Sequence, residues 1–390
     1  MSDGTVYDVV ILGAGVAGLC LARALLDAGG PWSILLVDGA RDEDDLRALS
    51  LWTSGPTPVD DLVRHQWTRL LVADGRGEPQ VAQLVTHRYQ TLFFADLQRA
   101  VKAALGADPR HRVVDGQAGA LRTVADGVEV EVGAETLRAR WAFDGRFRRT
   151  GFGDGSASPL WQHFHGLLVR SATDAFDPST VVFLDFRSEL PPGTAFVYLL
   201  PFNKREALVE LVTLHPVDAE GVLRRYLTRV HGAGVVEVVD REGGVSPLTA
   251  RRFDPFDGPR TRRIGIPAGR MKASTGYALT RILDDTAAIV RSLQTRGHPM
   301  VRPPGRRLYR LLDAVFLTLW ARWPERMPTV FAALFTRVPA DGVLRFLDER
   351  ATIRDLATIL ARLPWAPFLR ALLAWIIGSL TGRGPHPRGP

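Results

Sequence analysis

Cysteine is nearly absent from this chain of 390 residues, which contains only Cys20. One thiol can neither form an internal disulfide nor supply the several ligands of a cysteine-based zinc cluster. A small scaffold held together by disulfides is therefore excluded, and the composition fits a reducing compartment.

A secretory signal and long apolar runs are also missing. The first residues, MSDGTVYDVVILG, contain no basic stretch followed by a long apolar run and a cleavage site, so we expect a cytoplasmic protein. The most apolar stretch, LPWAPFLRALLAWIIGSL at 363–380, contains Arg370 and is at the lower limit of what could span a bilayer.

Negative charge is scarce in the C-terminal part. Residues 306–390 contain 13 Arg and 6 acidic residues, whereas residues 1–305 contain 36 charges of each sign. Basic, apolar helices suit an anionic surface, and the apolar content favours lipid over nucleic acid. We expect no nucleic acid partner. We expect the protein to associate peripherally with the inner face of the cell membrane. Residues 363–380 could equally form an ordinary core helix.

Glycine is plentiful, and three glycines form a pattern near the start of the chain. Gly13, Gly15 and Gly18 follow the apolar run YDVVIL and open a segment with helical periodicity, and Asp38 ends the next apolar run. In a dinucleotide-binding turn such glycines permit the sharp turn, the approach of a pyrophosphate and close helix packing, while the acid accepts hydrogen bonds from ribose. The spacing predicts a Rossmann-like dinucleotide site.

A later stretch, RWAFDGRF at 140–147, favours FAD over NAD. It is typical of a strand that ends in Asp144 and Gly145 and returns to the same sheet, as in a flavoprotein with an inserted substrate domain. A second loop precedes a helix predicted over about 277–295, and its amides could face a phosphate or a flavin ring. The residues expected to contact the cofactor in this loop are Gly269, Lys272, Ser274, Thr275 and Gly276.

Short alternating strands bounded by Pro, Gly or Asn fill residues 155–250 and predict an antiparallel sheet. Several helices are predicted from residue 305 to residue 380. The predicted organisation is a discontinuous FAD-binding domain (1–150 and 255–300), a β-sheet substrate domain (151–254), a helical membrane-facing region (301–380) and a disordered tail (381–390).

With these blocks in order, the sequence resembles the bacterial lycopene cyclase family of flavoproteins. The matching stretches are DVVILGAGVAGL, LWQHFHG, VVFLDFR, FVYLLPFNKREALVE, KASTGYALTRI, AAIVRSL, VLRFLDE and LPWAPFLRALL. The resemblance implies an α/β fold of the aromatic hydroxylase type, with a Rossmann-like FAD-binding domain. It also implies that Arg47, at the start of RALSLW, belongs to the cofactor region.

The family, as the resemblance implies, binds FAD and closes the linear end of an apolar isoprenoid polyene into a six-membered ring. Reduced FAD is required although no net redox change occurs, and NADPH is the expected reductant. An acid protonates a terminal double bond, the neighbouring alkene attacks the cation, and a proton leaves. A carboxylic acid kept protonated by an apolar site could supply the proton, and reduced flavin could stabilise positive charge.

Two positions depart from the family pattern. Relatives continue after Gln-His-Phe with Gly-Trp-Glu, and that glutamate is implied to be essential, but Leu168 stands at its position here. Leu49 stands where relatives have an aromatic residue. If the reaction is retained, another acid must supply the proton.

Four residues are candidates for proton transfer. Glu210 matches a family carboxylate on a strand expected to line the pocket, and Asp185 lies between apolar residues on another strand. His163 and His165 share one strand face and could carry protons near neutral pH, or could be a packed pair. A metal site is not expected, because the sequence suggests no third ligand.

Two other functions remain open. The chain could be a redox flavoenzyme, such as a monooxygenase, a reductase or a desaturase, acting on a lipid or terpenoid. It could also be a non-catalytic flavin- or polyene-binding protein. A cyclase of an isoprenoid end group, with a substrate that need not be a carotenoid, ranks first.

Overall fold

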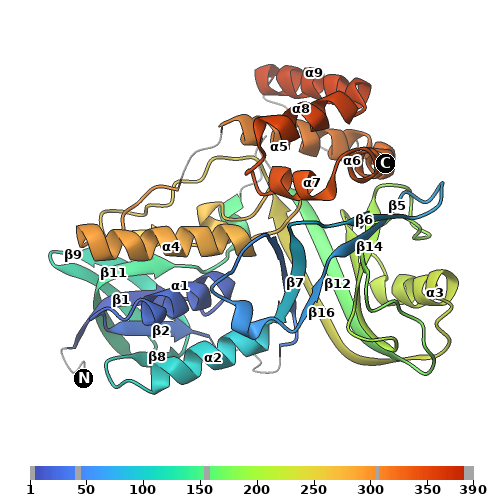
Figure 1. Cartoon of the computed structure of the whole chain (residues 1–390). Coiled ribbons are helices and arrows are strands. Elements are labelled where there is room, and N and C mark those ends of the chain that lie inside the picture. Colours follow the sequence, from blue (N-terminus) through green and yellow to red (C-terminus); the bar gives the residue numbers. More distant parts are fainter. Residues whose placement is uncertain (1–4, 40–44, 153–158, 304–306, 382–390) are drawn as a thin grey trace.

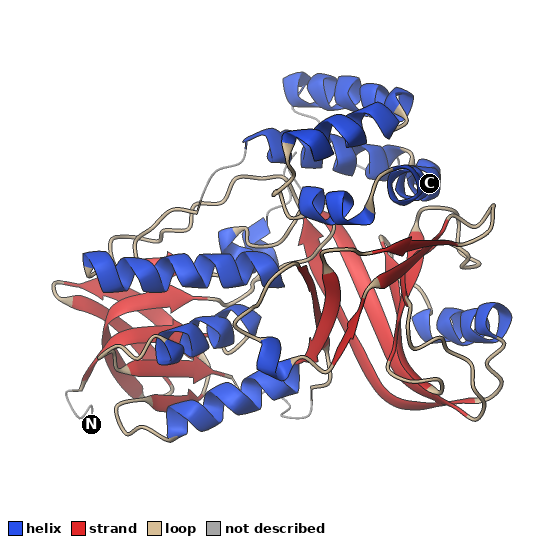
Figure 2. Ribbon diagram, viewed as in Figure 1, coloured by secondary structure: helices blue, strands red, loops and turns tan. Residues whose placement is uncertain are grey.

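The computed structural model describes residues 5–39, 45–152, 159–303 and 307–381 (Figure 1). Two seven-stranded sheets stand side by side, a three-stranded sheet lies between them, and a group of helices caps one side of the molecule (Figure 2). The architecture is the α/β arrangement with C-terminal helices that the sequence predicts.

The first sheet has the strand order β8-β2-β1-β11-β10-β9, with β17 paired to β11. Its strands are β1 (Val6–Leu12), β2 (Ile34–Asp38), β8 (Arg112–Asp115), β9 (Ala118–Val124), β10 (Gly127–Val132), β11 (Glu135–Asp144) and β17 (Thr261–Arg263). β11 runs parallel to β1, so residues 140–147 return to this sheet as predicted.

Three helices cover one face of the first sheet: α1 (Val16–Asp27), α2 (Phe94–Gly106) and α4 (Leu279–Arg296). Val9 and Ile11 of β1 point to the core shared with these helices, whereas Val10 and Leu12 point to the core formed with β9 and β10. The second half of β1 is therefore buried on both faces, which explains the apolar run Val9–Leu12.

The second sheet has the order β16-β12-β15-β14-β13-β5-β6. Its strands are β5 (Arg69–Ala73), β6 (Gln80–Gln83), β12 (Leu160–Ser171), β13 (Val181–Asp185), β14 (Ala195–Pro201), β15 (Glu206–Thr213) and β16 (Val236–Leu248). The expected antiparallel pairing holds except between β13 and β5, which are parallel. The sheet is thus larger than residues 151–254, because β5 and β6 come from the stretch assigned to the FAD-binding domain.

The two faces of the second sheet contact different layers. Val197, Val209 and Leu211 share a core with α3 (Ala219–His231). Leu200 and Leu208, on the opposite face, share a core with the C-terminal helices. Because successive side chains of a strand point to opposite faces, even-numbered residues of β14 and β15 face away from α3.

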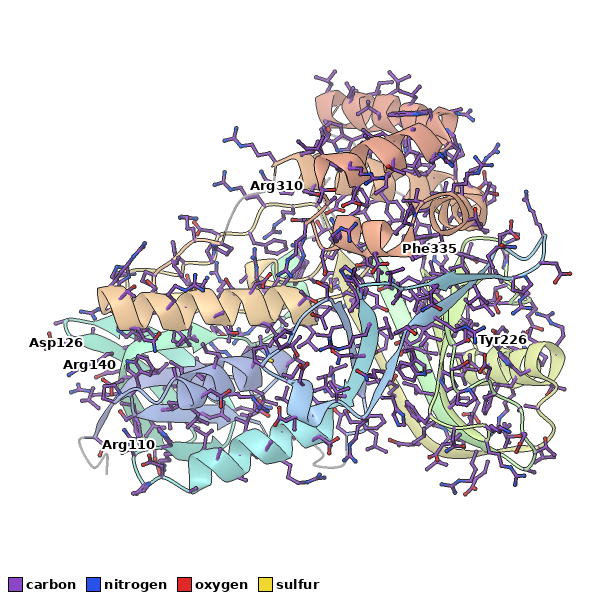
Figure 3. The ribbon with its side chains drawn as sticks, viewed as in Figure 1. Arg110, Asp126, Arg140, Tyr226, Arg310 and Phe335 are labelled. Carbon is purple, nitrogen blue, oxygen red and sulfur yellow. The ribbon has the colours of Figure 1, made fainter. Side chains whose placement is uncertain are left out.

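The C-terminal helices are α5 (Arg307–Arg322), α6 (Met327–Arg337), α7 (Ala340–Leu347), α8 (Ile353–Arg362) and α9 (Trp365–Thr381). Figure 3 shows Phe335 of α6 on the side of the sheet opposite Tyr226 of α3, and the Phe335 ring packs edge-on against Phe183 at 5.5 Å between ring centroids. Thr381 ends α9, and the rest of the predicted tail lies outside the described residues.

No single helix of the described chain is long and apolar enough to cross a membrane. α8 and α9 together pass such a test of length and composition, but they are bent by 100° at their junction.

The small sheet joins the two large ones. It consists of β3 (Ala48–Thr53), β7 (Arg88–Phe93) and β4 (His65–Trp67), in the order β3-β7-β4. This sheet carries Arg47, Leu49 and Ser50 to the junction, where all three line the main cavity.

Candidate functional site

The glycine-rich turn between β1 and α1 forms one wall of the cavity. Gly13 adopts φ +95°, a conformation that favours glycine. A Cβ on Gly18 would lie 2.1 Å from the Gly13 carbonyl oxygen, so only glycine fits there. Gly15 caps α1 without a side-chain hydrogen bond, which leaves backbone N–H groups available to an anion.

Asp38 holds this turn from the neighbouring strand. Its Oδ1 accepts a hydrogen bond from the Ala14 N–H at 2.9 Å. Gly15 and Gly18 line the cavity, whereas Gly13 and Asp38 lie behind them. The structure therefore brings together the four residues predicted from the spacing. Gly15 and Gly18 line the cavity, and Gly13 and Asp38 support the turn.

A second wall comes from the ends of β11 and β17 and from the loop before α4. The Gly145 N–H donates to the Leu12 carbonyl oxygen at 2.9 Å, which fixes β11 beside the glycine-rich turn. A Cβ on Gly265, at φ +65°, would lie 2.7 Å from the Ala17 Cβ. Ser274, Thr275 and Gly276 line the cavity as predicted, and they directly precede the first turn of α4.

The cavity has a volume of about 470 Å³ and extends from the glycine-rich turn to the second sheet and the C-terminal helices. At the far end its walls are mainly aromatic and apolar. The residues concerned are Phe164, Phe183, Leu184, Phe196, Tyr198, Val212, Trp320, Phe331 and Leu347. One continuous space thus has an amide-lined end and an apolar end, with room for a polar cofactor beside an apolar substrate.

Glu210 of β15 is the predicted acid that the structure places in this wall, and its exposed fraction is 5%. Its Oε2 accepts a hydrogen bond from the Tyr198 hydroxyl at 2.7 Å. Burial raises the pKa of the Glu210 carboxyl well above its usual range, and the adjacent Glu242 raises it further, while the Tyr198 hydroxyl acts in the opposite direction. The surroundings of Glu210 therefore favour the protonated form of its carboxyl.

Glu242 of β16 also lines the cavity, and the sequence reasoning missed it. It lies next to Glu210 because Gly166 of β12 pairs with Glu210 on one side and Glu242 on the other. A Cβ on Gly166 would lie 2.5 Å from the Glu242 Cγ, so the missing side chain makes room for the carboxyl. The signal available in the sequence was a Glu before two glycines in a strand, which by itself indicates no partner.

The other three catalytic candidates lie on the opposite face of the second sheet. Asp185 accepts hydrogen bonds from the Tyr226 hydroxyl (2.6 Å) and from the Arg187 guanidinium (2.6 Å), on the α3 side. His163 and His165 share one face, as predicted, but it is the face opposite Phe164, and neither lines the cavity. Burial lowers the pKa of His163, and the charges of His165, Arg149 and His215 lower it further.

Several predicted cofactor contacts have partners within the protein. Lys272 donates to Asp313 and Glu349 and is not among the residues of the cavity wall, so its expected contact with FAD stays a prediction. Gly269 ends a short helical turn at φ +69° and Asp144 pairs with Arg146, both outside the wall. Arg47 does line the cavity.

The Arg47 guanidinium pairs with Asp45 at 2.6 Å and lies 4.7 Å from the centre of the Phe94 ring. These contacts hold the guanidinium in the wall of the cavity that Gly15 and Gly18 also line, and a cation there would complement an anionic group.

The two positions that depart from the family pattern are both near the cavity. Leu49 is in its wall. Leu168 lies two residues beyond Gly166 on the same face of β12, is buried, and pairs with Leu208. Among the described residues, no group of three or more His, Cys, Asp or Glu side chains could hold a metal ion.

Comparison of the structure with solved structures defines the class of protein. The flavin-dependent brominase Bmp2 matches with a TM-score of 0.59 and 13% sequence identity, over 97% of this chain and all of that one. PqsL, a probable FAD-dependent monooxygenase from Pseudomonas aeruginosa, matches with a TM-score of 0.55 and 15% identity, over 92% of this chain and all of that one. The fold is that of the FAD-dependent monooxygenases and halogenases.

Sequence comparison then defines the family. The family model described as lycopene cyclase protein matches residues 8–373. A lycopene beta-cyclase from Paracoccus sp. is 26% identical over 395 aligned positions, which cover 94% of this chain and 96% of that protein. The chain belongs to the lycopene cyclase family, as its resemblance indicates.

Proposed function

We propose that this protein is a FAD-dependent cyclase that closes a ring at the end of a linear isoprenoid polyene, with protonated Glu210 as the acid. The observation that carries the proposal is the buried carboxyl of Glu210 in the wall of a cavity that also contains the glycine-rich turn. Lycopene is the first substrate to test, because the matched relatives are lycopene beta-cyclases.

The residues present fit FAD. The amides at the start of α1, near Gly15 and Gly18, would hold the diphosphate, and Ser274, Thr275 and Gly276 would lie along the rest of the cofactor. When bound in its reduced form, which NADPH would produce, FAD supplies an electron-rich ring that stabilises positive charge nearby. Because the reaction is an isomerisation, it consumes neither electrons nor oxygen.

The reaction begins with proton transfer from Glu210 to a carbon of the terminal double bond, which leaves a tertiary cation. The next alkene attacks this cation, so that a carbon–carbon bond closes the ring and the positive charge moves into it. Loss of a proton from a neighbouring carbon to a carboxylate restores the double bond, and no atoms are gained or lost. Phe183, Phe196 and Tyr198 would exclude water and present aromatic faces to the cation.

The apolar substrate requires access to a membrane, and we propose that α8 and α9 supply it by lying on the inner face of the cell membrane. Large apolar side chains are exposed along one side of α9 at Leu369, Leu373, Ile377 and Leu380, by 52%, 62%, 61% and 82%. Arg354 and Arg362 of the preceding helix α8 are also exposed. An apolar stripe beside arginines fits a bilayer containing anionic lipid.

The test of the enzymatic proposal is expression in a bacterium engineered to accumulate lycopene, followed by chromatography of the pigments. We expect the wild type to form a cyclic carotene and Glu210→Gln to form none while retaining FAD, because the amide has no acidic proton. Glu206→Gln is the matched control on the same strand, since Glu206 is near Arg170 at the exposed end of the sheet.

Two outcomes would contradict the proposal. Full activity of Glu210→Gln would show that another group donates the proton. Unchanged lycopene with the wild type, together with substrate-dependent consumption of NADPH and oxygen, would favour a redox flavoenzyme, which is the activity of the fold's monooxygenase relatives.

A further inference from the structure

A second carboxyl lies against the proposed acid. Glu242 comes from β16 and Glu210 from β15, and the two strands flank β12 at Gly166. Both side chains lie on the cavity face, and Glu242 extends over Gly166 toward Glu210, since a Cβ on Gly166 would lie 2.5 Å from the Glu242 Cγ. Two carboxyl groups in contact in a buried site do not both ionise, because the like charges repel each other in a medium of low dielectric constant.

The surroundings of the two carboxyl groups differ. Burial raises the pKa of the Glu242 carboxyl, whereas its contact with Glu210, the hydrogen bond that its Oε2 accepts from the Ala48 N–H at 2.8 Å, and the charge of Arg47 all lower it. Glu242 Oε1 is buried and has no hydrogen-bond partner among the described residues. That oxygen can accept a hydrogen bond from the protonated carboxyl of Glu210.

Glu210, in contrast, is surrounded by neutral groups. The Tyr198 hydroxyl donates a hydrogen bond to Glu210, and a negative charge on Glu210 would raise the pKa of the nearby Tyr89 and Tyr277 hydroxyls. Burial raises the pKa of each of these hydroxyls, so all three stay protonated at neutral pH. No cation among the described residues forms an ion pair with Glu210, so nothing there compensates a negative charge on it.

We propose that Glu242 is a positioning residue that shares one proton with Glu210, so that Glu242 carries the negative charge and Glu210 carries the proton toward the substrate. This inference rests on the proposed cyclase function. In the reaction, Glu210 delivers its proton to the polyene, and the proton released on ring closure restores the pair to one proton. The backbone N–H of Ala48 ties this pair to β3 and hence to the flavin side of the cavity.

The test compares pH profiles of cyclisation for the wild type and Glu242→Gln. Removal of the like charge lowers the pKa of Glu210. We therefore expect the alkaline limb of the profile, where activity falls as pH rises, to move to lower pH by about one unit or more. At pH values above the wild-type limb, the activity of the variant should be about tenfold lower than that of the wild type. Activity in acid and the KM for the polyene stay near wild type. Glu237→Gln is the matched control on β16, where Glu237 is exposed and pairs with Arg170.

Gly166→Ala probes the same pair without removing a charge. The new Cβ displaces the Glu242 side chain, whose Cγ and Oε1 would lie at 2.5 and 2.7 Å from it, and we expect the limb to move in the same direction as in Glu242→Gln. An unchanged limb in both variants overturns the inference.

An infrared titration of the carboxyl C=O band separates this inference from the cyclase proposal, since it needs no substrate. In an Asp348→Asn background, which removes another buried carboxyl with a raised pKa, the protein with FAD bound should show a buried protonated carboxyl at pH 7 that is absent after Glu210→Gln and that deprotonates at lower pH after Glu242→Gln. A band that persists after Glu210→Gln in this background, or a titration unaffected by Glu242→Gln, contradicts the shared proton. If the infrared titration is as expected but no cyclisation occurs, the shared proton is supported and only the proposed cyclase function is rejected.

Discussion

Asp348 is a second carboxyl whose environment disfavours ionisation. It follows the last turn of α7 and lines a small pocket with Trp52, Tyr277 and Arg281. Burial raises its pKa to about 7, although Arg350 and Arg281 lower it. At this residue the folded protein therefore binds a proton that the unfolded chain releases near the ordinary pKa of aspartate, about 3.9.

The expected consequence is a loss of stability as pH rises. With a folded pKa above the unfolded one, the contribution of Asp348 is fully present below about pH 4 and is lost as the pH approaches 7. Asp348→Asn, which is always neutral, should unfold at nearly the wild-type temperature at pH 4.5 and at a higher temperature at pH 8. Calorimetry at both values checks this. A constant difference across the range would show that ionisation of Asp348 plays no part.

At the scale of elements, a buried ion cluster joins α4, α5 and the segment after α7. Lys272, in the loop before α4, contacts Asp313 of α5 at 2.7 Å and Glu349 at 3.1 Å. Arg281 of α4 also pairs with Glu349. The side chains of Lys272, Asp313 and Glu349 are each at most 10% exposed, so removal of one charge leaves others buried and uncompensated.

We expect Lys272→Met to lower the free energy of unfolding by about 3–5 kcal/mol, the usual cost of breaking a buried ion pair on one side. The FAD content of the folded fraction should not change, because Lys272 lies outside the cavity wall. Denaturant unfolding and flavin absorbance measure the two quantities. Lys204→Met, at an exposed pair with Asp174, is the control. Reduced FAD affinity at wild-type stability would restore Lys272 as a cofactor ligand.

On the scale of the whole molecule, charge and apolar surface are concentrated at the same end. The excess of Arg over acidic residues lies in residues 306–390, and the exposed apolar side chains of α9 lie in the same region. If this end meets a bilayer containing anionic lipid, apolar contact and charge attraction would both favour binding.

Vesicle flotation tests membrane binding. We expect the wild type to float with vesicles of phosphatidylglycerol and phosphatidylcholine, and less with phosphatidylcholine alone or at high salt. Leu373→Asp with Ile377→Asp should lose most of the binding, because two charges would enter the apolar layer. Val235→Asp, at an equally exposed apolar residue away from these helices, is the control. Loss of a dimer in the double variant, without vesicle binding by the wild type, would assign this face to a second copy of the chain.

Local patterns identified much of the site. The spacing of Gly13, Gly15 and Gly18 predicts a turn that only glycine can form, because the constraint comes from backbone atoms a few residues apart. Glu210 stood out as a carboxyl on an apolar strand and is buried in the cavity wall. The ion pairs of Lys272 were not foreseen, because its partners, Asp313 and Glu349, are 41 and 77 residues away in the chain.

The sequence by itself determined the glycine-rich turn, the antiparallel strands within residues 155–250 and the helical C-terminal part, since these follow from local periodicity and backbone conformation. The tertiary structure alone decided which side chains meet in the cavity. Alternation along β12 puts His163 and His165 on one face, but the packing of α3 against that face directs them away from the cavity. Strand register decided that Gly166 lies between Glu210 and Glu242, because the pairing of distant strands depends on the whole sheet.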